Sequence, residues 1–188
     1  MSGKKENSQR QKVVKLTVAA VLTALSLVLM ATLRFPVFTS FYELEFSDFP
    51  ILVCTFLLGP LYGIVSLFIV CLIQTLTVSS FSGIIGFIMH FVASGAMILT
   101  VYFIKSKLTS FKGTLISSVS GALIMTVIMI PMNIWLTSVF MQLPASDFIK
   151  GYLGFCVAFN LLKSVSNIVI FYASFSTVNK IYKKFFER

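Results

Sequence analysis

Apolar residues fill six long segments of this chain, and charged residues, prolines and glycines separate each segment from the next. The segments cover residues 13–33, 49–58, 61–78, 84–104, 114–140 and 148–181. A helix needs about 20 mostly apolar residues to cross a bilayer. The pattern therefore predicts an all-α membrane protein in which six transmembrane helices form one bundle, with residues 1–188 as a single domain.

The second segment is short for a membrane helix, because about ten residues reach only about 15 Å. The Gly59-Pro60 step separates it from the third segment and predicts a tight turn. The alternative, one helix over residues 49–78, would reverse the orientation of every later segment.

The placement of charges decides whether the chain has six spans or five. With six spans and the N-terminus inside, the cytoplasmic side receives twelve of the 15 basic residues: Lys4, Lys5, Arg10, Lys12, Lys15, Lys105, Lys107, Lys112, Lys180, Lys183, Lys184 and Arg188. The outer side receives Arg34 and Lys150, with four of the six acids: Glu43, Glu45, Asp48 and Asp147. Cytoplasmic loops of membrane proteins carry an excess of Lys and Arg. Six spans are favoured, with both termini and a polar tail over residues 1–12 in the cytoplasm.

Composition excludes several classes of protein. The chain has 57% hydrophobic and 11% charged residues and a mean hydropathy of +0.97, against about 45–50% and about 25% in soluble domains. A water-soluble enzyme is excluded, and basic residues beside membrane helices require no nucleic-acid partner. Cys54, Cys71 and Cys156 lie in apolar stretches without metal-ligand spacing, so we interpret them as small core residues.

Two segments need separate interpretation. Lys12 and Lys15 followed by an apolar run would also fit a secretory signal, but the run is long enough to span and the rest of the chain is polytopic. A retained first helix is therefore favoured. Residues 34–48 form a long external connection rich in Phe and Leu, too apolar to float in water, and we expect it to fold back onto the bundle as a lid.

Lys163 is, apart from His90, the ionisable residue that lies deep inside a predicted span. A charge there costs about 2.5–3.5 kcal/mol on insertion scales and by default marks a functional site. Asn160, Lys163 and Asn167 are spaced i, i+3 and i+7, so they share one helix face. We interpret this face as a polar ligand site or water-lined cavity. A helix-packing network is the alternative.

The fifth span holds Pro131 and Asn133 in an equally apolar setting. Proline interrupts the helix ladder, which membrane helices tolerate where the freed carbonyl finds a partner or lines a cavity. Asn133 is a candidate for completing the polar site, and a packing kink explains the pair equally well. Gln74 and His90 are weaker candidates.

The motifs of several enzyme classes are absent from the sequence. It has no phosphate-binding loop, no HExxH, no paired cysteines and no carboxylate in the predicted spans. Proton-coupled carriers usually need an intramembrane acid, and metalloproteases or phosphotransferases need acid or His clusters. We therefore expect no enzyme, no metal site and no cofactor, and active transport would need another subunit to supply energy.

Small residues on the first span form a candidate docking stripe. Ala20 and Ala24 are one helical turn apart, with Ala31 near the same stripe, and such a step lets another helix approach closely. Packing inside the bundle is the alternative.

These features occur together in one known family. They are the six-helix size, the alanine step, the loop that runs into Leu44-Glu45-Phe46-Ser47-Asp48-Phe49-Pro50, the turn Leu58-Gly59-Pro60-Leu61-Tyr62-Gly63, and the face of Asn160, Lys163 and Asn167. Over its whole length the chain resembles the substrate-binding S components of energy-coupling factor (ECF) vitamin transporters, most closely the riboflavin-specific ones.

The resemblance implies a bacterial cell-membrane protein that binds a vitamin near its outer face, under the first loop. It further implies docking through Ala20 and Ala24 onto a membrane T component that carries two cytoplasmic ATPases. ATP hydrolysis would then reorient the S component and release the vitamin inside.

Charge narrows the choice of ligand. Lys163 would repel a cation such as thiamin, and a strongly anionic ligand would have to pass Glu43, Glu45 and Asp48. A neutral planar ring with carbonyls and hydroxyls satisfies both constraints, and riboflavin is our hypothesis. The expected contacts are Lys163, Asn133, Asn160 and Asn167 on the polar groups, Glu43 as a cap, and Phe41, Leu44 and Phe46 over the ring. Another vitamin such as biotin or pantothenate, a stand-alone facilitator and a membrane enzyme remain alternatives.

Overall fold

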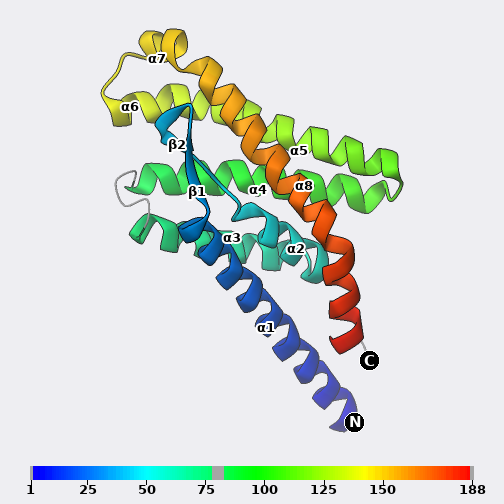
Figure 1. The fold of residues 1–188 in the computed structure, drawn as a ribbon. Helices are drawn as coiled ribbons and strands as arrows, with labels where there is room; N and C mark the ends of the chain where they lie inside the picture. Colours follow the sequence, from blue (N-terminus) through cyan, green and yellow to red (C-terminus); the bar gives the residue numbers. More distant parts are fainter. Residues whose placement is uncertain (1, 78–82, 187–188) are drawn as a thin grey trace.

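The computed structural model describes residues 2–77 and 83–186 of the chain, except for the side chains of residues 2–8, 40, 41 and 186. Its elements are α1 (Ser2–Thr32), β1 (Arg34–Val37), β2 (Thr39–Glu45), α2 (Asp48–Leu58), α3 (Pro60–Leu76), α4 (Gly83–Lys107), α5 (Phe111–Met132), a π-helical turn (Asn133–Thr137), α6 (Ser138–Met141), α7 (Ala145–Gly151) and α8 (Leu153–Phe186). Figure 1 shows a helical bundle with one small hairpin.

Four helical stretches in the described part of the chain are long and apolar enough to cross a membrane. They are Gln9–Thr32, Gly83–Lys107, Phe111–Met141 and Leu153–Phe185, whereas α2 and α3 are shorter. The predicted multi-pass helical protein is thus confirmed, and the count of six spans stays a prediction. Large apolar side chains such as Phe111 and Trp135 point outward, as expected of helices that face lipid.

The Gly59-Pro60 turn separates α2 from α3, as the sequence predicts. Gly59 caps α2 with a φ of 106°, a left-handed backbone that favours glycine, and Pro60 opens α3. Just beyond, a Cβ on Gly63 would lie 1.9 Å from the Thr55 hydroxyl oxygen. Only glycine lets the two helices approach so closely at this turn.

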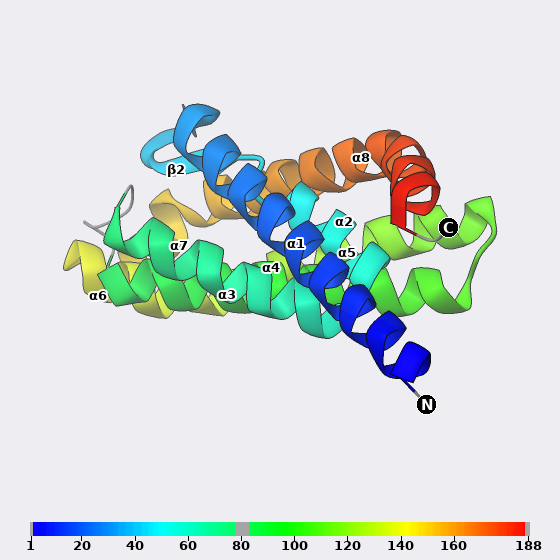
Figure 2. The same cartoon turned by 90° about the horizontal axis from the view of Figure 1, so that it is seen from below.

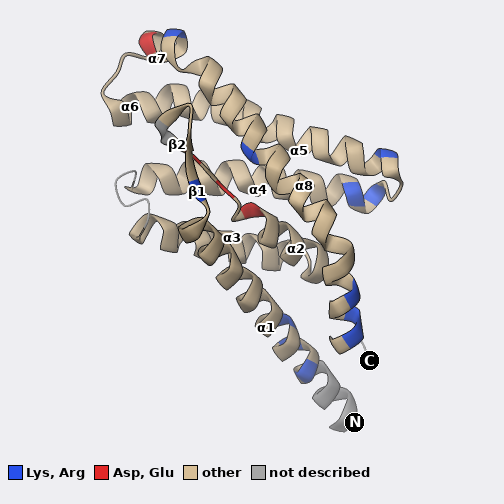
Figure 3. Ribbon diagram, in the orientation of Figure 1, with Lys and Arg blue, Asp and Glu red and all other residues tan. Residues whose placement is uncertain are grey.

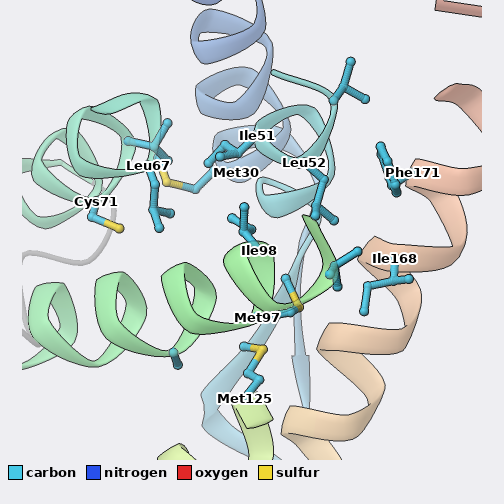
Figure 4. Packing of buried hydrophobic residues seen from close by; sticks show 14 of the residues in the cluster. Met30, Ile51, Leu52, Leu67, Cys71, Met97, Ile98, Met125, Ile168 and Phe171 are labelled. Carbon is cyan, nitrogen blue, oxygen red and sulfur yellow. The ribbon is translucent and has the colours of Figure 1, made fainter. Parts of the chain in front are cut away.

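The short helix α2 lies inside the bundle, where it contacts α1, α3, α4 and α8. Ile51 and Leu52 are fully buried and pack with Met97, Ile98 and other residues of the main core (Figure 4). Neighbouring helices shield α2 from lipid. Although α2 is too short to cross a bilayer, the backbone groups at its ends are therefore not exposed to hydrocarbon.

The connection after α1 corrects the all-α prediction, because it folds as a two-stranded antiparallel hairpin. Arg34 pairs with Glu45 and Pro36 with Glu43, and the register shifts between Pro36 and Val37. Aromatic and β-branched residues are abundant here, and these residue types favour strands. The hairpin lies against the bundle, as expected for the predicted lid.

Two of the predicted segments also differ from the structure. The predicted polar tail is helical from Ser2, since its Lys, Glu, Gln and Arg residues are good helix formers that prolong the apolar helix. The predicted last span over residues 148–181 is split into α7 and α8 at Tyr152, whose φ of −123° is not helical. Gly151 and Gly154 flank this break and weaken the helix there.

Charges are segregated along the bundle (Figure 3). Basic segments of α1, of the turn between α4 and α5, and of the last part of α8 lie towards the same end in Figures 1 and 2. Acidic segments lie on β2, at the start of α2 and on α7, away from that end. The predicted topology depends on this separation of basic from acidic segments. The cytoplasmic location of the termini stays a prediction.

Candidate ligand-binding site

A cavity of about 550 Å³ lies between the hairpin and the helices. The segments that line it lie mainly in the half of the bundle that carries α6 and α7, as the ribbon in Figure 1 allows the reader to follow. Its walls come from β1 and β2, the end of α3, the first half of α4, the segment from α5 to α6, and α8. Ligand cavities in proteins usually span about 300–1,000 Å³, so this one has room for a vitamin-sized molecule.

Lys163 lines the cavity and forms a buried ion pair with Glu45. The Lys163 Nζ atom lies 2.9 Å from Glu45 Oε1, and the two side chains are only 9% and 3% exposed. The sequence predicted Glu45 at the outer rim, and this prediction is wrong. The hairpin directs its carboxylate into the cavity. Burial raises the pKa of Glu45, but Lys163 and His90 beside it outweigh that effect and hold the pKa below its ordinary value.

Asp48 and His90 extend this pair into a buried polar network. Asp48 opens α2, is fully buried, and accepts a 2.9 Å hydrogen bond from Ser94 Oγ. His90 Nε2 lies 3.2 Å from Asp48 Oδ1 and Nδ1 lies 2.6 Å from Gln74 Oε1. Both ring nitrogens of His90 thus lie within hydrogen-bond distance of an oxygen atom. The rim position expected for Asp48 is likewise wrong.

Asn167 lies outside the cavity, although it shares a helix face with Lys163. Its Nδ2 donates to the Glu45 and Lys163 carbonyls at 3.0 Å, and its Oδ1 accepts from the Phe49 amide at 3.0 Å. Ser26 donates to the Ser47 carbonyl at 2.9 Å from the other side. These hydrogen bonds hold the segment that joins the hairpin to α2 against two helices, α8 and α1. The helix-packing interpretation therefore applies to Asn167.

Asn133 and Asn160 both line the cavity. The π-helical turn after Pro131 begins at Asn133, whose Nδ2 donates to the Met129 carbonyl at 2.8 Å while its Oδ1 accepts from Tyr42 and Thr137. Asn160 Nδ2 donates to the Cys156 carbonyl, and its buried Oδ1 has no hydrogen-bond partner among the described residues. Buried polar atoms almost always have a hydrogen-bond partner, so this oxygen is a candidate acceptor for a ligand donor.

The loop residues that were expected to contact the ligand lie in different surroundings. Glu43 lines the cavity, as does Glu45 two residues later on the same strand face. Leu44 and Phe46 are absent from the cavity wall, and Leu44 packs instead against the cluster of Tyr42, Phe148, Cys156 and Phe159. The side chain of Phe41 is outside the described residues.

The apolar wall of the cavity comes mainly from the helices. It includes four methionines, Met89, Met125, Met129 and Met141. Tyr42 and Phe159 add two rings stacked at 4.9 Å between centroids. Methionine side chains adapt to irregular and aromatic ligands, so this wall suits a flat ring system.

The family model for the ECF transporter, substrate-specific component, matches residues 14–175. The chain belongs to this family. It is 30% identical over 169 residues to the riboflavin transporter FmnP of Bacillus subtilis (strain 168), covering 85% of this chain and 89% of that relative. Its fold matches a solved S component of a bacterial ECF transporter with a TM-score of 0.77, at 23% identity, over 90% of this chain and 97% of that one. The predicted recognition as an S component is confirmed.

Sequence reasoning missed several wall residues of this S component, above all Glu45 and His90 as parts of one network. A signal for Glu45 was present, because a buried lysine in a membrane bundle needs an anionic partner and the first loop holds three of the chain's six acids. The adaptable wall of methionines had no comparable signal, since methionine is equally common in ordinary cores.

Proposed function

We propose that this S component binds riboflavin in the cavity and delivers it across the bacterial cell membrane. The observation that carries the proposal is that the cavity wall has a polar part and an apolar part. One part presents Lys163, Asn160, Asn133 and Gln74, and the other presents methionines and the rings of Tyr42 and Phe159. Riboflavin has the same division, with carbonyls, an imide N–H and hydroxyls on a flat apolar ring.

Specific groups match this chemistry. Lys163 is a donor for a ring carbonyl, and the unpartnered Oδ1 of Asn160 is an acceptor for the imide N–H or a ribityl hydroxyl. The 30% identity to a riboflavin transporter supports the same ligand.

Transport also needs a membrane T component and two ATPases, which the family resemblance implies for this chain. The separation of basic and acidic segments supports cytoplasmic termini and a cavity near the outer face, beneath the hairpin. Ala20 and Ala24 are exposed on α1, whereas Thr23, Ser26 and Met30 face the bundle. Their exposure supports docking of a partner helix at the alanine step rather than internal packing.

Co-purification tests the ligand assignment. We expect protein purified in detergent from riboflavin-replete cells to be yellow and to release riboflavin on denaturation, in about a one-to-one ratio. Colourless protein that takes up no added riboflavin would overturn the proposal. Binding of biotin or pantothenate instead would identify an S component for another vitamin, and uptake into liposomes without ATPases would indicate a stand-alone facilitator.

A further inference from the structure

The hairpin and the start of α8 share an exposed apolar surface. Phe35 and Phe38 are 50% and 53% exposed, and Leu33 before the hairpin and Phe155 on α8 are exposed as well. The rings of Phe38 and Phe155 lie 5.8 Å apart between centroids, where the turn of the hairpin reaches the first part of α8 (Figure 1). We call these four residues the hairpin patch.

The charged residues of the hairpin lie on its other side. Arg34, Glu43 and Glu45 are the three charged residues of the two strands, and all three line the cavity. Phe35 pairs with Leu44, so strand alternation places Phe35 on the face opposite Glu43 and Glu45. A lid with water on its outer side would carry its charges there, because charged side chains are mostly solvated. This hairpin has the reverse arrangement, as a segment in contact with lipid would.

Phe38 lies at a turn position that favours other residue types. Its φ of 67° is in the left-handed region, where Gly and Asn fit at low cost and a bulky residue is rare. The turn geometry therefore does not account for a phenylalanine. Packing within the chain does not account for it either, since the contact with Phe155 leaves the ring half exposed. Contact with a partner that covers the ring would account for it.

The position of the patch favours lipid as this partner. Phe155, Leu162 and Val165 are exposed apolar residues spaced i, i+7 and i+10, so they share one face of α8. Because α8 is long and apolar enough to cross the membrane, lipid covers this face. The hairpin patch continues the same surface through Phe155, so the same lipid layer reaches it.

We propose that the hairpin patch is a membrane-contacting surface, which inserts Phe35 and Phe38 at the boundary between lipid headgroups and acyl chains. The backbone determines this depth. A two-stranded hairpin has unpaired backbone groups at its edges, which hydrocarbon cannot satisfy and the hydrated headgroup region can. One face of the hairpin thus covers the cavity, and the patch anchors the hairpin in the bilayer. The proposal does not depend on which ligand the cavity binds.

The chain has a single tryptophan, Trp135, which makes the lipid contact measurable. Trp135→Phe/Phe38→Trp moves the only indole to the turn of the hairpin. The matched control, Trp135→Phe/Ser146→Trp, moves it to an exposed polar position on α7. Wild-type protein is the lipid reference, because Trp135 is strongly exposed within the candidate span Phe111–Met141.

The three proteins are reconstituted into phosphatidylcholine vesicles, with and without bromine on the acyl chains close to the headgroups. Brominated lipid should reduce the emission of the turn indole to an extent comparable with that of Trp135, and should affect the α7 indole much less. Aqueous iodide should show the opposite order. Quenching of the turn indole by iodide and not by brominated lipid would overturn the proposal, because the hairpin would then face water. Quenching by neither would also overturn it, since a second copy or another protein would then cover the patch.

Labelling of wild-type protein covers the case in which the variants do not fold. A small diazirine probe that partitions into the bilayer reacts on illumination with the side chains that it contacts, and peptide mass spectrometry locates the label. We expect label on Phe35 or Phe38 as well as on the lipid-facing Val165. Label on Val165 with none on the hairpin would contradict the proposal.

Discussion

Removal of the Lys163 ammonium leaves the buried Glu45 carboxylate without its closest cation, so Lys163→Met should affect both folding and binding. Methionine keeps the length of the side chain and removes its charge. Loss of one partner of a buried pair costs about 3–5 kcal/mol. His90 lies 3.6 Å from Glu45 and compensates in part, so we expect the low end of this range. For a chain of this size that corresponds to a fall in Tm of about 6–12 °C.

The double variant Lys163→Met/Glu45→Gln separates the two roles of the lysine. Without a buried unpaired charge it should recover at least half of the lost Tm. Riboflavin affinity should stay low, because the donor to the ligand is still missing. A lost hydrogen bond from a charged donor costs about 1.5–3 kcal/mol, or about 10–150-fold in Kd.

Thermal unfolding in detergent and titration of flavin fluorescence measure the two effects on the same samples. If the double variant unfolds at the same temperature as Lys163→Met, the ion pair is not what stabilises the site. If it binds riboflavin as tightly as wild type, Lys163 does not contact the ligand, and its role is limited to holding Glu45.

Three other predictions concern single positions. Asn160→Ala removes the unpartnered Oδ1 and should weaken riboflavin binding about 5–30-fold; affinity equal to wild type would exclude this oxygen as a ligand contact. Asn167→Ala strips hydrogen bonds from the buried backbone of Glu45 and Phe49 and should speed riboflavin dissociation and lower Tm, whereas the exposed Ser176→Ala on the same helix should change neither. Ala24→Leu should leave riboflavin binding intact and abolish uptake by cells, while Val28→Leu, also exposed on α1, should permit uptake; uptake by the Ala24 variant would exclude the alanine step as a docking surface.

The helical architecture was predictable because a helix that crosses a bilayer needs a long, mostly apolar segment. Long apolar runs indicate helices, and the Gly59-Pro60 step correctly predicted the turn between α2 and α3. The hairpin was not predicted, since its Phe and Tyr residues read only as an apolar loop. Its pairing depends on contacts with the bundle that composition does not encode.

The site was predictable in part for a related reason. Lys163, Asn133 and Asn160 are conspicuous because polar groups are rare in membrane helices, and all three line the cavity. Glu45 and Asp48 were misplaced, because acidic residues in a connecting segment are normally solvated. Their inward orientation follows from hairpin register and from the partners that Lys163, His90 and Ser94 provide. Helical spacing likewise grouped Asn167 with the site, although within the described part of the chain its side chain bonds only to backbone atoms.

Direct titration of purified wild-type protein with vitamins tests the central claim, that the cavity binds riboflavin. The account predicts saturable quenching of flavin fluorescence at about one riboflavin per chain. Excess thiamin, biotin or pantothenate should not reverse the quenching. Absence of quenching in folded protein, or displacement of riboflavin by one of these other vitamins at equal concentration, would contradict it.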